Sequence, residues 1–329
     1  MIAPMEFLEK AATGLGLSLY TVAADPGARV YAGYIIIGAL IAFAIGGRET
    51  LEKGILDRAI WTSKSARIDY LSMVLNPLAL ALGWSALILN SAWVTSGVQS
   101  ALSAFGPFAL PSPFVWIAAT LAVFLAHDLA VYVAHWLMHK IPALWEFHKF
   151  HHSAERLNVF TAHRAHPAEL LVAGSVMALL IGGTNGVLYA LIGPETAPAT
   201  LAGANVVWVA ANIAGGSLRH TEVWLSFGPR VERWIISPAM HQIHHSEAEK
   251  HWDKNLGATL AVWDRLFGTL YVTHGREELT YGFGEETPEF RTLKGAYLAP
   301  FAKAARKMSL NNPDEAKSMP GVVEGQSAP

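Results

Sequence analysis

Long apolar runs alternate with polar segments through the first two thirds of the chain. Residues 30–46 are almost wholly apolar and just long enough to cross a bilayer. Similar runs cover 70–94 and 114–133, and a further apolar pair covers 169–192 and 197–215. Runs of this length with so little charge favour membrane helices over the core helices of a soluble protein. The pattern therefore predicts an all-α integral membrane protein.

The remaining segments divide the chain more finely. Residues 1–29 form an amphipathic lead-in, and the sequence Lys140-Ile-Pro142 is expected to end the third apolar helix. Gly182, Gly183 and Gly186 interrupt the fourth run, so the pair 169–215 is expected to be either a membrane hairpin or a partly re-entrant segment. We expect one domain over 1–308 and a disordered tail over 309–329.

Charge asymmetry between two connections orients these helices. The connection 48–69 carries five basic residues, Arg48, Lys53, Arg58, Lys64 and Arg67, whereas 95–113 carries no charge. By the positive-inside rule, 48–69 is cytoplasmic and 95–113 lies on the opposite side. The third span then returns to the cytoplasm at residue 135. We expect a multi-pass protein, in a bacterial inner membrane, with its site on the cytoplasmic side.

Composition narrows the function classes. The chain is 52% hydrophobic and only 15% charged, with positive mean hydropathy, as is typical of an integral membrane protein. A net charge of −2 does not indicate the basic surface that nucleic-acid binding needs. The chain has no cysteine, which excludes disulfides, thiolate metal ligands and cysteine-held iron–sulfur clusters. Residues 1–20 lack the basic start of a signal peptide.

Histidine spacing supplies the candidate chemistry. His135 and His139 are four residues apart, and the pattern His-x-x-His-His occurs twice, at 148–152 and 241–245. Residues three and four apart share one helix face, so each segment presents two or three imidazoles together. Neutral imidazole binds zinc, iron, copper and nickel. The eight histidines are too many for one ion and suit two. They are His135, His139, His148, His151, His152, His241, His244 and His245.

Chance does not explain these clusters. Histidine is 14 of 329 residues, and random placement predicts about 0.03 copies of His-x-x-His-His. Three isolated histidines, His127, His251 and His274, are interpreted instead as satisfied or solvated side chains.

Asp128 lies on the same face as the first cluster. Asp128, Tyr132, His135 and His139 fall at i, i+4, i+7 and i+11 of one helix. An ionisable residue at membrane depth suggests a functional role. Asp128 could orient a metal ligand without binding the metal itself, or it could pair with a nearby base at a helix end.

The three histidine boxes, in this order, resemble the fatty acid hydroxylase / sterol desaturase superfamily. The flanking residues do so too, and the similarity covers roughly 115–272. Those residues are Asn158, Thr161, Arg164-Ala-His166-Pro167, Asn255-x-Gly257 and Trp263-Asp264-Arg265-Leu266-Phe267-Gly268-Thr269.

This resemblance implies about four transmembrane helices under a cytoplasmic, histidine-lined helical cap. It also implies a non-haem di-iron centre that uses O₂ to hydroxylate or desaturate lipid C–H bonds. His220 matches a family position that supplies an additional ligand. Some members carry a further histidine one turn away, where this chain has Gly216 and Trp224. His166, or water, is a candidate for that coordination position.

The expected reaction needs more than this chain supplies. Two electrons must come from elsewhere, and no Gly-x-Gly-x-x-Gly motif or cluster-binding cysteine is present. We therefore expect an external reductase or ferredoxin-like donor, with a bilayer lipid as substrate. Sterol, carotenoid, fatty acyl and ether lipids all fit, as do both hydroxylation and desaturation. The alternatives are a metal-binding membrane scaffold and a metal transporter, whose ligands should lie near the bilayer midplane.

Overall fold

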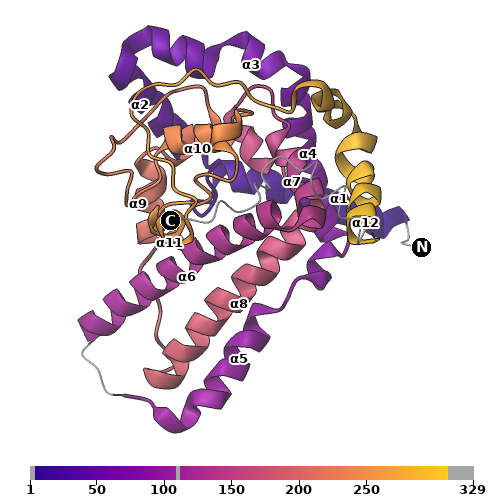
Figure 1. Ribbon diagram of the computed structural model, residues 1–329. Coiled ribbons are helices and arrows are strands. Elements are labelled where there is room, and N and C mark those ends of the chain that lie inside the picture. Colours follow the sequence, from indigo (N-terminus) through magenta and orange to yellow (C-terminus); the bar gives the residue numbers. More distant parts are fainter. Residues whose placement is uncertain (1–3, 109–111, 310–329) are drawn as a thin grey trace, which may run out of the picture.

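The computed structural model describes residues 4–108 and 112–309, which form a predominantly helical protein (Figure 1). The α-helices are α1 Pro4–Ala23, α2 Ala32–Leu51, α3 Arg58–Thr62, α4 Lys64–Ala81, α5 Ser91–Leu102, α6 Ser112–Lys140, α7 Pro142–His152, α8 Pro167–Leu191, α9 Val206–Ile213, α10 Pro238–His244, α11 Val262–Phe267 and α12 Ala299–Ser309. The short helices η4 Val159–His163 and η5 Gly216–His220 matter for the site. One small sheet pairs β1 Thr200–Leu201 with β2 Ala204–Asn205. The predicted helical class is confirmed.

Several of these helices are long and apolar enough to cross a membrane. Three candidates are Ala32–Thr62, Pro113–Lys140 and Pro167–Leu191, and a fourth arises if Lys64–Ala81 and Trp84–Phe105, bent by 66°, form one span. Large apolar side chains on α6, such as Phe114 and Trp116, face outward. Because lipid tails satisfy such surfaces and water does not, the chain is a membrane protein with three to four apolar helices.

The structure corrects two predicted segments. Residues 197–215 form the small β-hairpin and the eight-residue α9, which is too short to cross a bilayer. Residues 95–102, predicted as connection, belong to α5, whose start is capped by the Asn90 side chain. The second apolar run is also broken, at Gly83, where φ is +119°. The predicted tail, 309–329, lies outside the described residues except for its first residue.

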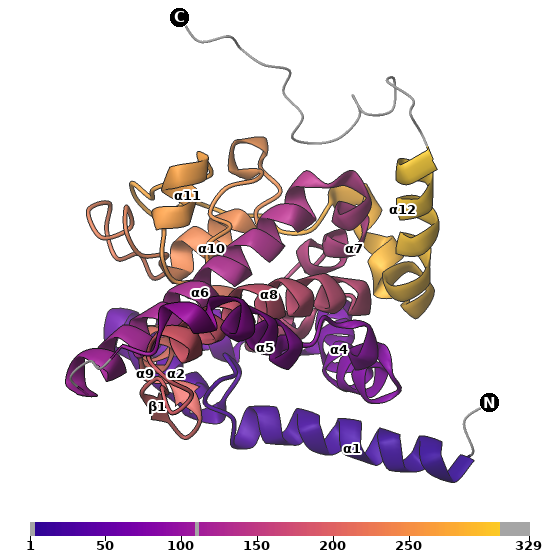
Figure 2. The same ribbon diagram turned by 90° about the horizontal axis from the view of Figure 1, so that it is seen from below.

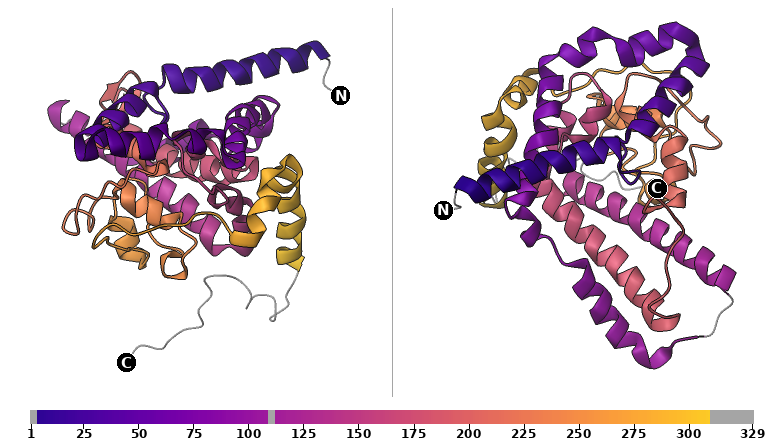
Figure 3. Two further views of the ribbon diagram at one scale, coloured as in Figure 1. Left: turned by 90° about the horizontal axis from the view of Figure 1, so that it is seen from above. Right: turned by 180° about the vertical axis from the view of Figure 1, so that it is seen from behind.

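The helices form an elongated bundle with a cap at one end. Helices α5, α6 and α8 pack side by side and extend away from α7 and α10 (Figures 1 and 3). Helix α1 lies along α4 (Figure 2). The cap consists of α7, η4, η5, α10 and the segments from 246 to 298. The predicted break at Pro142 is confirmed, because α6 ends at Lys140 and α7 begins at Pro142.

Glycines on α8 allow the close approach of α5. A Cβ at Gly182 would lie 2.8 Å from the Ser91 carbonyl oxygen, and one at Gly186 would lie 2.7 Å from that of Thr95. The Thr95 hydroxyl donates across this contact to the Gly182 carbonyl, at 3.0 Å. Small residues and interhelical hydrogen bonds are the usual basis of helix packing in membranes. These glycines therefore tighten the bundle instead of weakening its helix.

A buried ion pair ties the cap to α4. Arg164 and Asp69 are fully buried, and Arg164 Nη1 lies 3.0 Å from Asp69 Oδ1. The other Asp69 oxygen accepts from Asn158 Nδ2 at 2.7 Å and from the Thr161 hydroxyl at 3.0 Å. Arg164 Nε donates to the Phe150 carbonyl of α7 at 2.9 Å. Both charges are therefore paired and hydrogen-bonded, as burial requires.

We expect Asp69→Ala to destabilise the protein by about 3–5 kcal/mol, because it leaves the Arg164 guanidinium buried without its partner. The double variant Asp69→Ala, Arg164→Met should cost less than the sum of its parts, since the two residues interact directly. Thermal unfolding in detergent, followed by circular dichroism, measures both. Glu49→Ala is the control, because Glu49 pairs with Lys53 on an exposed surface. A transition for Asp69→Ala at the temperature of this control would contradict the expectation.

Candidate metal centre

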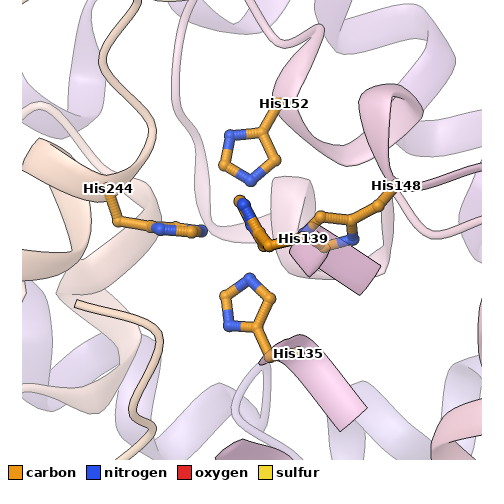
Figure 4. A group of neighbouring side chains, drawn as sticks. All are labelled: His135, His139, His148, His152 and His244. Carbon is orange, nitrogen blue, oxygen red and sulfur yellow. The ribbon is translucent and has the colours of Figure 1, made fainter. Parts of the chain in front are cut away.

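Nine histidines meet at the junction of bundle and cap, in two adjoining groups. The first group is His135, His139, His148, His152 and His244, and the second is His151, His220, His241 and His245. Within each group the candidate ligand nitrogens lie within 4.8 Å of one another. Figure 4 shows the rings of the first group turned toward a common space. The groups touch, since the ring centroids of His152 and His245 are 4.8 Å apart.

Each His-x-x-His-His box contributes to both groups. On α7, His148 and His152 enter the first group and His151 the second, whereas on α10 His241 enters the second group and His244 the first. Residues four apart lie on nearly the same face, whereas neighbours diverge by about 100°. The adjacent histidine pair in each box therefore spans two sites. Pro142 and Pro238 occupy the first turns of these helices, and the Ser237 hydroxyl caps α10.

Hydrogen bonds to oxygen fix the orientation of four rings. In His135, His139, His151 and His244, Nδ1 lies between 2.8 and 3.1 Å from its acceptor. The acceptors are, in the same order, Leu256 O, Asp253 Oδ1, Arg164 O and Lys254 O. His148 Nδ1 lies 3.1 Å from Glu169 Oε1 without a hydrogen bond. A proton held on Nδ1 leaves the Nε2 lone pair free for a metal. The main-chain acceptor of His151 belongs to Arg164, so the buried ion pair also supports the site.

The free nitrogens fit a metal ion. Buried Nε2 atoms of His135, His139, His152 and His244 have no hydrogen-bond partner in the described part of the chain, and both ring nitrogens of His245 are likewise unpartnered. Unpartnered buried polar atoms are costly unless something binds them. Burial lowers the pKa of both His148 and His151 to about 3, so these rings are neutral at physiological pH. A donor set of neutral imidazoles suits zinc, iron, copper or nickel.

Asp128 holds a loop and touches none of the nine histidines. Its carboxylate accepts from the backbone amides of Thr259 and Leu260, at 2.9 and 3.1 Å, and from Trp263 Nε1 at 2.9 Å. The neighbouring Leu256 carbonyl faces His135. Asp128 and His135 therefore lie on one helix, as predicted. The link between Asp128 and the histidines is indirect, because Asp128 holds the 253–269 segment and that segment holds His135. Helix α11, in the same segment, ends at Gly268, where φ is +75°.

His166 does not join either group. Its Nδ1 accepts from the Ala168 amide at 3.0 Å, which caps α8, and its Nε2 lies 3.1 Å from the Tyr297 carbonyl. Both ring nitrogens are occupied, so His166 is not carried into the proposed ligand set. His220 does join, with its Nε2 3.0 Å from His241 Nε2. His127 and His251 lie outside both groups, against Trp208 and Glu277 respectively.

Two residues at the site escaped the sequence analysis. Glu169 stands 3.1 Å from His148, and the one available signal was a carboxylate at the start of an apolar run. Asp253 accepts from His139 and from Lys140 Nζ, and its isolated position gave no signal.

Cavities flank the histidines on two sides. One, of about 160 Å³, is lined by His135, His148, His151, His220 and His241 together with apolar residues of α6 and α8. The other, of about 560 Å³, is lined by the remaining four histidines and by Trp145, Trp252 and Phe283 of the cap. The first leads toward the apolar bundle and the second toward the cap surface, so the centre is reachable from both.

Known proteins share the region that carries this site. The model of the fatty acid hydroxylase family matches residues 120–269. Human alkylglycerol monooxygenase is 30% identical over 189 residues, which cover 57% of this chain and 37% of the relative. An ornithine lipid hydroxylase of Rhizobium tropici is 30% identical over 141 residues, covering 42% and 37%. A fatty acid hydroxylase of a Lecanicillium species is 25% identical over 162 residues, covering 47% and 43%.

The chain thus spans less than half the length of these relatives. A comparison with solved structures gave no match. The family match ends at Thr269 and includes all three histidine boxes and His220. The matches to residues 120–269 support the predicted resemblance of this chain to the fatty acid hydroxylase / sterol desaturase superfamily.

Proposed function

We propose that this protein is a di-iron, O₂-dependent hydroxylase of a membrane lipid. The observation that carries the proposal is the pair of adjoining, all-imidazole groups at the end of an apolar helix bundle. The relatives are a monooxygenase and a hydroxylase, which favours hydroxylation over desaturation. Hydroxylation balances as one C–H bond, O₂, two electrons and two protons giving one C–OH group and water.

Different residues of this chain would bind the metals, line the substrate cavity and orient the ligands. Nine imidazoles would hold two iron ions, which supply when bound the redox chemistry that O₂ needs to attack an unactivated C–H bond. Ala134, Met138, Ala173 and Met177 line the cavity beside them and would admit an alkyl chain while excluding water. The acceptors behind the rings would keep each ligand in one tautomer.

Electrons would come from a separate protein. No cysteine is available for an iron–sulfur cluster, and the sequence has no dinucleotide-binding glycine motif. A reductase or ferredoxin-like donor must therefore reach the centre from outside. The larger cavity, which Trp145 and Trp252 of the cap line, would be the side from which this donor approaches.

We expect purified protein from iron-replete cells to hold about two iron ions per chain, because each histidine group provides enough nitrogens for one. The double variant His139→Ala, His244→Ala depletes the first group, and His220→Ala, His241→Ala depletes the second. Each should lose about one metal, measured by elemental analysis, whereas exposed His274→Ala should lose none. Metal near zero in the natural protein, or unchanged in both double variants, contradicts the assignment. Zinc in place of iron does not.

We expect membranes containing the protein, a reductase system and ¹⁸O₂ to yield a lipid with a labelled hydroxyl group. His151→Ala should abolish turnover, since it removes a ligand. Asp128→Ala should reduce turnover by about 10–100-fold, the usual effect of losing support behind a ligand. Lipid mass spectra report both. Loss of two hydrogens without label would indicate desaturation, and no His151-dependent change would overturn the function.

We expect the histidine cap and residues 48–69 to share the cytoplasmic side. The structure supports a common side, because Arg156 of the cap contacts Asp57, and Arg164 contacts Ser65. Lys64→Cys and Ser100→Cys place single, exposed thiols in a chain without cysteine. An impermeant thiol reagent applied to intact cells should label only Ser100→Cys, and Lys64→Cys only after permeabilisation. The reverse labelling pattern would show that the histidine cap lies on the outer side of the membrane.

A further inference from the structure

A cationic side chain faces the smaller cavity from outside the histidine boxes. Arg29, in the connection between α1 and α2, lines this cavity with five of the nine histidines. Its guanidinium carbon lies 5.2 Å from the centre of the Trp208 ring. The Trp208 indole donates to the Gly27 carbonyl at 3.0 Å, which fixes this connection against α9. Among the described residues, Arg29 makes no hydrogen bond or ion pair.

Burial makes this cation unfavourable without a counter-charge. It lowers the pKa of Arg29, because a buried guanidinium is costly unless an anion pairs with it.

Nearby carboxylates do not supply that counter-charge in full. Asp128 interacts electrostatically with Arg29, but its oxygens already accept from Thr259, Leu260 and Trp263. Glu169 lines the same cavity but is directed at His148. Arg29 therefore lines the cavity without a carboxylate bonded to it in the described part of the chain.

We propose that Arg29 forms a binding subsite for the oxyanion headgroup, phosphate or carboxylate, of the lipid substrate. Guanidinium groups bind both anions with charge-assisted hydrogen bonds. The role of this subsite in holding the substrate rests on the proposed function. Its existence does not, because anion binding can be measured without turnover.

An apolar path beside Arg29 accommodates the chain of such a lipid. A cavity of about 190 Å³ is lined by Gly27, Phe124, Ile181 and Trp208, among others. Phe124 stands eleven residues before His135 on α6, a distance of about 16 Å along the helix. This cavity is separate from the one beside the histidines, and Trp208, which Arg29 contacts, lines it. A headgroup at Arg29 would leave the part of the lipid to be oxidised in the cavity beside the histidines and would let a second alkyl segment enter this one.

The test compares probes that differ only in charge. Decyl phosphate, decanol and inorganic phosphate are titrated into the metal-loaded protein in a non-ionic detergent, and binding is measured by calorimetry. We expect decyl phosphate to bind at least about tenfold more tightly than decanol. Arg29→Gln should reduce that ratio to near one while leaving decanol affinity and metal content unchanged. Arg29→Lys should retain part of it, since the charge remains but the planar fork is lost.

Controls separate the subsite from general charge effects. Arg233→Gln makes the same change at an exposed position and should keep the full ratio. Equal binding of decyl phosphate and decanol by the natural protein would overturn the subsite, as would a ratio that survives Arg29→Gln. Inorganic phosphate that binds as tightly as decyl phosphate would show a site for free anion instead of a lipid headgroup. A charge-selective protein with no lipid turnover would disprove the proposed function and leave the subsite standing.

Discussion

The structure depends on one constraint: each imidazole at the centre must be neutral and must turn a particular nitrogen inward. Four rings meet it by hydrogen-bonding an oxygen through Nδ1, and three of those oxygens belong to residues 253–256. That segment is held in turn by Asp128 and Asp264, whose carboxylates accept from backbone amides between residues 256 and 260. The metal centre, the loop behind it and the last turns of α6 therefore form one unit.

Helices α6 and α8 link this unit to the membrane bundle. Helix α6 carries lipid-facing Phe114 and Trp116 at one end and His135 and His139 at the other, so one continuous helix connects the bilayer to the ligands. Helix α8 does the same, from the glycines that admit α5 to Glu169 beside His148. A substrate drawn from the bilayer would follow these two helices. In the proposed subsite, Arg29 would place a cation beside the histidines.

Periodic features could be read from the sequence. The spacing of the boxes identified all nine grouped histidines once His220 was added by resemblance, and Pro142 marked a helix end correctly. Features set by tertiary contact could not. Residues 197–215 are apolar enough to span, but packing folds them into a hairpin and α9. His166 lies in a family motif, yet both its nitrogens serve hydrogen bonds that only the fold creates. Arg29 is far from every box in sequence and gave no signal.

X-ray absorption at the iron edge tests the central claim most directly, because it counts the imidazoles around each metal. With groups of five and four histidines, the account predicts an average of four to five imidazole nitrogens per iron and no sulfur. His274→Ala should leave the spectrum unchanged. A shell dominated by oxygen, with one or two imidazoles, would show that iron binds elsewhere on the protein and would contradict the account.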